Sequence, residues 1–296
     1  MQTLESFSLS LFWCGLVAVA SASLFYALAT WGWRVVVRTA ATNAGTVSIS
    51  ERQPLPPMFG RLGTLATWTA LAFLLSSMAT RAIATGHPPY SNMFEYLTAF
   101  GTVTALFYAL FERRYGQRTL GAFAMPLSLG WLVLAQAVFS PKITPLVPAL
   151  QNNRLLAIHV ACMVISYGAL TVAFAATLLY LIQGDKNRFP RLPKGRLLES
   201  LTYRAVLVGF PILGLGIALG AYWGNIAWGR YWGWDPKETT ALVTWLIFAG
   251  FLHARSLAGW RGNRAAIIVV AGWSMITFNI FVVNFVIAGL HSYAGA

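Results

Sequence analysis

The chain has 296 residues, of which 57% are hydrophobic and only 10% are charged, and its mean hydropathy is +0.63. These few polar side chains cannot cover the surface of a soluble globular protein of this length. The composition therefore excludes a water-soluble protein and indicates one that lies in a bilayer. The 21 Lys and Arg against 8 Asp and Glu give a net charge of +13, and the positions of these residues decide what the charge means.

Eight segments are long and apolar enough to cross a bilayer, for which a helix needs about 20 residues. We therefore predict an all-α polytopic membrane protein with eight transmembrane helices. Because the number of crossings is even, both termini lie on the same side of the membrane. In chain order the segments are 9–31, 61–82, 93–112, 119–139, 155–183, 203–222, 238–255 and 266–290.

The basic residues are distributed unevenly over the two sides that this path defines. Sixteen of the 21 flank the links 32–60, 113–118, 184–204 and 255–265. Basic residues are retained on the cytoplasmic side, so we predict that both termini and the link 222–238 face the extracytoplasmic side. The net charge then reflects topology and contact with anionic lipid, and it does not indicate a nucleic-acid partner. The five basic residues on the outer side are Arg81, Lys142, Arg154, Arg230 and Lys237.

The first segment and the links give no sign of a second domain. Small residues at 18–23 are similar to a signal-peptide cleavage region, but no basic stretch precedes the segment and its apolar run continues to Trp33, so we interpret it as a retained helix. Prolines mark the links 140–154 and 184–204 as loops. Residues 1–296 are therefore predicted to form one membrane domain.

The two cysteines, Cys14 and Cys162, are solitary and lie within predicted helices. A small buried hydrophobe is the commoner role of such residues. The sequence has no C-x-x-C motif. It therefore lacks a dithiol for redox exchange, and it lacks the attachment motif of a c-type cytochrome.

The link 222–238 has an unusual composition, with four tryptophans, two tyrosines and four charged residues. Tryptophan is large and flat, so several of them spaced by glycines indicate a platform for a flat apolar ligand at the membrane edge. An aromatic belt at the interface is the alternative, although it fits a single tryptophan better than four in one link. We predict that Asp235 caps the following helix, with Pro236 at N1 and Glu238 at N3. The tryptophans are Trp223, Trp228, Trp232 and Trp234.

Three of the four histidines fall on the predicted outer side. His159 lies about one turn into the fifth helix, His291 follows the eighth, and His87 lies in the loop 86–92. Histidines on facing elements can hold a haem iron from both faces, and His159 and His291 fit that geometry. For each of the three taken singly, an interfacial residue bonded to a carbonyl is an equal alternative.

His253 differs from the other histidines in its depth. It lies 15 residues after Glu238 (253 − 238), and at 1.5 Å per residue this is roughly 22 Å from the outer end, in the inner part of the membrane. An imidazole in a spanning helix is a functional candidate, since polar groups there are costly unless paired. At its own depth His253 has no partner in this sequence, so we expect one from another subunit.

These residues carry a resemblance to a known family. The segment 223–238 resembles the tryptophan-rich WWD signature, WGxxWxWD, of haem-handling membrane proteins that act in cytochrome c maturation. The rest of the chain is similar to the CcsA family of the System II pathway, also called the CcsB or ResC type. The resemblance covers about residues 60–296 without departure at the signature positions, while the first helix matches only as a hydrophobic segment. The further segments that carry it are 86–95, the region of His159, 251–255 and 289–293.

The resemblance implies a set of haem-binding residues. The two external ligands of the family match His159 and His291, and its intramembrane ligand matches His253, whereas the family role of His87 is less defined. The tryptophans and Asp235 correspond to the signature that contacts haem. Haem b is implied as a transported, non-covalent substrate. The sequence offers no independent nucleophile or acid pair. We therefore expect a structural, supporting role for Asp235 and Glu238, and we predict no catalytic residue.

The resemblance also implies a function, partners and a location. The family moves haem b to the outer membrane face and presents it for thioether attachment to the C-x-x-C-H of apocytochromes c. A second intramembrane histidine comes from a ResB-type partner, which we expect here as a separate chain, and thiol-reducing proteins act indirectly. The chain would thus be a subunit of a cytochrome c synthase (haem lyase) complex. We expect it in a bacterial plasma membrane, with a thylakoid membrane as the alternative.

Other functions fit part of this pattern. A haem-delivery subunit of the CcmC sort shares the signature, but such subunits are smaller than eight spans. A quinone-linked electron-transfer subunit with permanent haem b ligands requires histidines paired at two depths, and only one is deep here. A secondary transporter is less well supported, because no helix pair broken by Gly or Pro and no acidic ion site stand out within the spans.

Overall fold

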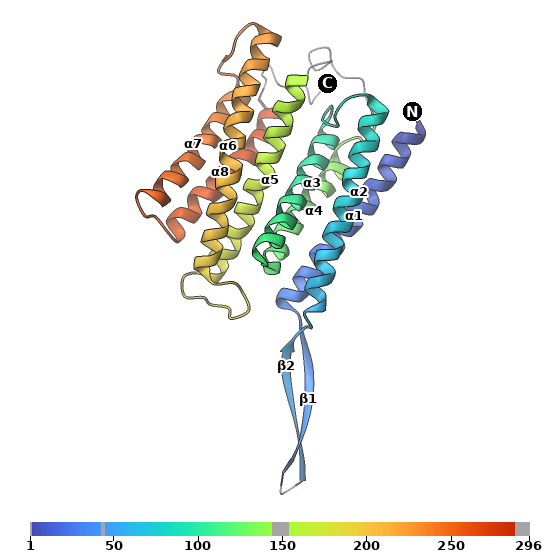
Figure 1. The fold of residues 1–296 in the computed structure, drawn as a ribbon, viewed down its shortest axis with the longest axis vertical. Helices are drawn as coiled ribbons and strands as arrows, with labels where there is room; N and C mark the ends of the chain where they lie inside the picture. Colours follow the sequence, from blue (N-terminus) through green and yellow to red (C-terminus); the bar gives the residue numbers. More distant parts are fainter. Residues whose placement is uncertain (1, 43–44, 144–153, 288–296) are drawn as a thin grey trace.

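A computed structural model describes residues 2–42, 45–143 and 154–287 of the chain, which form a helical bundle with one projecting β-hairpin (Figure 1). The elements in chain order are α1 (Gln2–Trp31), β1 (Trp33–Thr42), β2 (Gly45–Pro54), α2 (Met58–Thr85), α3 (Met93–Tyr115), η1 (Arg118–Leu120), α4 (Gly121–Val138), α5 (Arg154–Gln183), α6 (Gly195–Trp228), α7 (Pro236–Ser256) and α8 (Asn263–Phe285).

The helices run up and down beside one another, so successive links lie at opposite ends of the bundle (Figure 1). One end holds the start of α1 and the links α2–α3 and α6–α7, and we call it the tryptophan end. The other end holds the β-hairpin and the link α5–α6, and we call it the hairpin end. Each of the eight predicted spans corresponds to one helix, although several bounds differ.

Among the described residues, seven helices are long and apolar enough to cross a membrane, which makes the chain an integral membrane protein. Helix α7 is outside this set although it has 21 residues. Its apolar stretch is shortened by Lys237 and Glu238 in the first turn and by His253 and Arg255 in the last turn. An eighth crossing therefore stays a prediction.

The β-hairpin corrects the prediction of an all-α fold. Residues 33–54, which lie in the predicted link 32–60, form two antiparallel strands of ten residues each, with Trp33 opposite Pro54 and Thr42 opposite Gly45. The β-branched run Val35-Val36-Val37 fits a pleated strand, and Gly45 begins the second strand. Both features favour a strand in this basic link, although neither forms an apolar run long enough to span a membrane.

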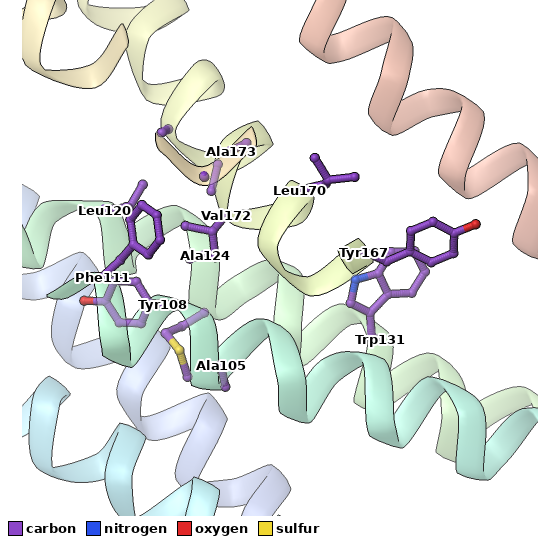
Figure 2. Close-up of a cluster of buried hydrophobic side chains, with 14 of the residues drawn as sticks. Ala105, Tyr108, Phe111, Leu120, Ala124, Trp131, Tyr167, Leu170, Val172 and Ala173 are labelled. Carbon is purple, nitrogen blue, oxygen red and sulfur yellow. The ribbon is translucent and has the colours of Figure 1, made fainter. Parts of the chain in front are cut away.

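The core of the bundle takes buried apolar side chains from all eight helices, and Figure 2 shows a part of it with labelled residues from α3, η1, α4 and α5. The Phe100 ring stacks on Trp131 with centroids 4.6 Å apart, and Phe174 stacks on Trp273 at 4.0 Å. Glycine permits close helix packing where the chain needs it: a Cβ on Gly168 of α5 would lie 2.6 Å from the Val103 side chain of α3. The close packing of α3 against α5 joins helices α1–α4 to helices α5–α8.

Candidate functional site

The tryptophan-rich segment is more helical than predicted. Helix α6 runs to Trp228 and ends at Gly229, which has φ 72° and closes the helix in the left-handed conformation that glycine adopts readily. The predicted link 222–238 is thus reduced to residues 229–235, and Trp223 and Trp228 lie in the last turns of α6. Trp223 is only 2% exposed, so it is part of the packed helix end.

The four tryptophans form two pairs and not one flat platform. The rings of Trp223 and Trp228 meet edge to face at 4.8 Å, and those of Trp232 and Trp234 do so at 5.8 Å. Trp234 is 70% exposed and has φ 57°, a strained backbone conformation for a bulky residue. Trp234 therefore offers apolar surface to a ligand, whereas Trp223 supports the end of α6 from within the packed structure.

The predicted cap of α7 is confirmed. The carboxylate of Asp235 accepts a hydrogen bond from the Lys237 amide at 2.9 Å, and Pro236 occupies N1. Glu238 accepts hydrogen bonds from the amides of Asp235 and Gly233, at 3.2 and 2.9 Å. Because the Asp235 side chain is turned inward and is buried, it sets the path of the link.

A polar contact that the sequence did not reveal joins the start of α7 to the end of α8. The Lys237 ammonium donates a hydrogen bond to Asn284 Oδ1 at 2.6 Å, and the Asn279 amide donates to the Lys237 carbonyl at 3.2 Å. Both asparagines are buried. Lys237 precedes the predicted span 238–255, and burial lowers its pKa to about 8 against an opposing effect of Asp235. The contact brings the end of α8 beside the link 229–235.

His159 is seated against α6 in a defined tautomer. Its Nδ1 lies 2.7 Å from the carbonyl oxygen of Gly216, and because a carbonyl only accepts, the neutral ring carries its proton on Nδ1 and its lone pair on Nε2. Histidines that bind metals commonly donate their other ring N–H to a backbone carbonyl in this way. The contact of the half-buried imidazole fits an iron ligand oriented through its other ring nitrogen, and it equally fits an interfacial histidine bonded to a carbonyl.

The other predicted histidines are placed apart from His159. His253 lies in the last turn of α7, toward the hairpin end, and its side chain is exposed on the surface of the bundle. The Nδ1 of His87 lies 2.9 Å from the Pro88 carbonyl oxygen in the α2–α3 link, as expected of an interfacial residue. His291 lies outside the described residues.

The described part of the chain contains no group of three or more His, Cys, Asp or Glu side chains placed to hold a metal ion. A haem iron has a different need, because the porphyrin supplies four ligands and the protein supplies one or two axial ones. His159, seated against Gly216 of α6, can supply one such ligand.

Comparison of the sequence with known proteins identifies the family of this chain. Residues 90–291 match the family described as cytochrome C assembly protein. The cytochrome c biogenesis protein CcsA of Gloeobacter violaceus is 33% identical, with 80% of this chain and 87% of that protein covered. The CcsA proteins of Chlamydomonas reinhardtii and Mesostigma viride are 41% and 36% identical, covering 70% and 84% of this chain and 61% and 90% of their own. The chain belongs to the CcsA family of cytochrome c biogenesis proteins.

The fold of this CcsA-family chain is also found in a larger protein. The solved structure of the cytochrome c haem lyase CcmF matches with a TM-score of 0.71 at 16% identity, covering 94% of this chain and 46% of CcmF. At that identity the match shows a shared fold only. The chain thus spans about half the length of a protein with the same arrangement of helices.

Proposed function

We propose that this CcsA-family chain carries haem b to the extracytoplasmic face and presents it there for thioether attachment to the C-x-x-C-H motif of apocytochromes c. In that attachment each cysteine S–H adds across a vinyl C=C bond of haem, so the step consumes no oxidant. The chain itself binds and orients haem, and the reacting thiols belong to the apocytochrome.

The seat of His159 carries this proposal. The imidazole is bonded to Gly216 in the tautomer that suits iron, and Trp223 lies only seven residues further along the same helix. A ligand held by Nε2 at this end would lie beside the indoles of the α6–α7 segment. The half-buried Trp228 and Trp232 and the exposed Trp234 would then contact the macrocycle, with the buried Trp223 packed behind Trp228.

The second outer ligand in this proposal is His291. Although it lies outside the described residues, the last described turn of α8 is fixed at the tryptophan end by the bond between Lys237 and Asn284. A residue that follows α8 by a few positions is within reach of the same end. His159 and His291 would bind the iron from opposite faces.

The arrangement of the two ends of the bundle supports a proposal for the membrane topology. We infer eight crossings, with both termini and the tryptophan-rich segment outside. In support, the basic β-hairpin and the basic link α5–α6 share the hairpin end (Figure 1), and such residues are retained in the cytoplasm. The membrane would be a bacterial plasma membrane or a thylakoid membrane.

An inner haem site is proposed at His253 together with a ResB-type partner chain. His253 is exposed on α7, on the face that would meet lipid or a second protein. An imidazole at that position is costly unless it is paired. A histidine from a transmembrane helix of the partner would complete the pair of iron ligands.

The test is the haem spectrum of the purified chain, with and without the partner, for His159→Ala, His253→Ala and His291→Ala. We expect His159→Ala and His291→Ala to change the outer signal, and His253→Ala to remove a signal that requires the partner. If none of the variants changes haem content or spectrum, the ligand assignment is wrong. If haem stays bound and cycles with quinol in the absence of any apocytochrome, an electron-transfer subunit is the better assignment.

A further inference from the structure

Helix α6 shapes the surroundings of His159 through two glycines. The carbonyl of Gly216 accepts the Nδ1 proton at 2.7 Å. One turn further along, Gly220 faces the ring itself: a Cβ at this position would lie 2.6 Å from Cε1 and 2.8 Å from Nδ1 of His159. Carbon atoms in ordinary contact are about 3.5–4.0 Å apart, so only glycine leaves room for the imidazole here.

The two glycines differ in how strictly they are required. At Gly216 an added Cβ would approach Met163 Sδ at 2.8 Å, and a methionine side chain can move aside because it is flexible. At Gly220 the nearest atoms belong to the His159 imidazole, which is held against α6 by its hydrogen bond to Gly216. The ring cannot move without losing its hydrogen bond to the Gly216 carbonyl.

Glycine inside a helix is otherwise unfavourable. Relative to alanine it costs about 1 kcal/mol of helix stability, because the unfolded chain loses more freedom. At Gly130 of α4 and Gly250 of α7 an added Cβ would meet nothing within 4 Å, so those two helical positions show no close contact that requires glycine. Gly220 is different, because the ring of the proposed ligand, His159, occupies the space that a side chain at this position would need.

The same helix also carries part of the tryptophan-rich segment. Trp223 follows Gly220 by three residues, about one helical turn, and α6 continues without a break to Trp228. Trp223 is 2% exposed and packs against Trp228. The distance from the seat of the imidazole to these indoles is therefore set by one rigid element.

We infer that Gly216 and Gly220 are positioning residues for the outer haem ligand: the Gly216 carbonyl holds the Nδ1–H tautomer, and the absent side chain of Gly220 fixes the plane and height of the His159 ring relative to Trp223. The inference rests on the proposed function, in which His159 Nε2 binds iron. In this inference, α6 orients His159 Nε2 toward a haem that lies against the indoles.

The test compares Gly220→Ala with two matched controls, Gly130→Ala and Gly250→Ala, in the full chain purified with its bound haem. In Gly220→Ala we expect the outer haem to lose its six-coordinate low-spin spectrum and its retention to fall about tenfold, the lower range for loss of an outer-shell contact to a metal ligand. Its midpoint potential should shift as well. The controls should keep the wild-type spectrum, and Gly216→Ala should have a smaller effect.

A double-mutant cycle distinguishes positioning from a general structural role. When the ring is removed in His159→Ala, adding Gly220→Ala should change neither haem content nor accumulation of the protein. If Gly220→Ala fails to accumulate but the double variant with His159→Ala accumulates, the rescue still identifies the contact between the two residues. If neither Gly220→Ala nor the double variant accumulates, the inference is overturned. A wild-type spectrum for Gly220→Ala also overturns it, provided that His159→Ala alters the spectrum; if His159→Ala has no effect, the proposed function itself fails.

Discussion

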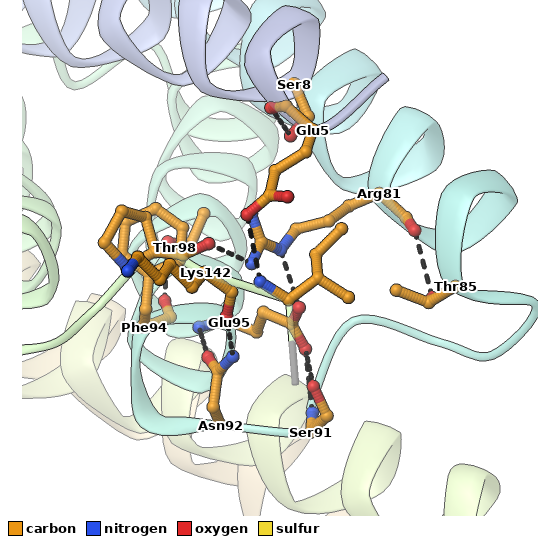
Figure 3. Close-up of polar contacts among 12 residues, drawn as sticks. Glu5, Ser8, Arg81, Thr85, Ser91, Asn92, Phe94, Glu95, Thr98 and Lys142 are labelled. Carbon is orange, nitrogen blue, oxygen red and sulfur yellow. Dashed lines mark hydrogen bonds and ion pairs between the residues drawn. The ribbon is translucent and has the colours of Figure 1, made fainter. Parts of the chain in front are cut away.

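At the scale of single residues, a buried ion pair ties α2 to the segment 86–95, which contributed to the family resemblance. Arg81 Nε lies 2.6 Å from Glu95 Oε1, and both side chains are almost fully enclosed (Figure 3). Glu95 also accepts hydrogen bonds from the amide and hydroxyl of Ser91, and Asn92 caps α3 through the Glu95 amide. These residues fix the α2–α3 link, so this part of the resemblance has a structural explanation.

Removing one member of this pair should be strongly destabilising. In Arg81→Met the Glu95 carboxylate stays buried without its cation, which typically costs about 3–5 kcal/mol. Arg118→Met is the control: the Arg118 side chain is 45% exposed, and its buried partner Glu112 keeps hydrogen bonds from tyrosine and threonine hydroxyls when the guanidinium is removed. Thermal denaturation in detergent should show a much larger loss for Arg81→Met. Equal losses would contradict a special role for the buried pair.

At the scale of the elements, α6 shows why the sequence predicted the helices better than their ends. Residues 203–222 were predicted, because this stretch is continuously apolar, yet α6 extends from Gly195 to Trp228. Its final turns contain Gly220, Gly224 and two tryptophans, a composition typical of a loop. They are helical because α6 packs against α5 there, and that packing depends on register between helices, which one sequence does not display.

The contact between α7 and α8 is expected to control the outer site. In Asn284→Leu the Lys237 ammonium loses its acceptor, so the end of α8 should loosen and the outer haem should be retained less well. Asn284→Asp supplies a carboxylate at the same place and should keep the haem. The measurement is haem bound per protein after washing in detergent, with the melting temperature as a check on folding. Retention that is unchanged in Asn284→Leu would show that this contact does not hold the outer site.

At the scale of the whole molecule, the sequence was sufficient for the class of protein and for the approximate helices, since apolar runs of spanning length are a strong signal. The cap at Asp235 followed from local chemistry and was confirmed. The β-hairpin was missed, because a ten-residue strand gives a weaker signal than a span. The His159 seat was also out of reach, because Gly216 and Gly220 lie 57 and 61 positions along the chain from it, and only the α5–α6 packing brings them together.

The orientation of the whole bundle yields a final prediction. With Cys14 and Cys162 replaced by alanine, we expect Tyr231→Cys in the exposed link 229–235 to react with a membrane-impermeant maleimide in intact cells. Ser48→Cys, on the β-hairpin, should react only after lysis, because the proposed topology places the hairpin with Arg34, Arg38 and Arg52 on the cytoplasmic side, where basic residues are retained. Both sites are exposed in the structure, so both should label in detergent, which controls for reactivity. The reverse pattern would place the tryptophan end inside the cell and would exclude delivery of haem to an outer site at His159.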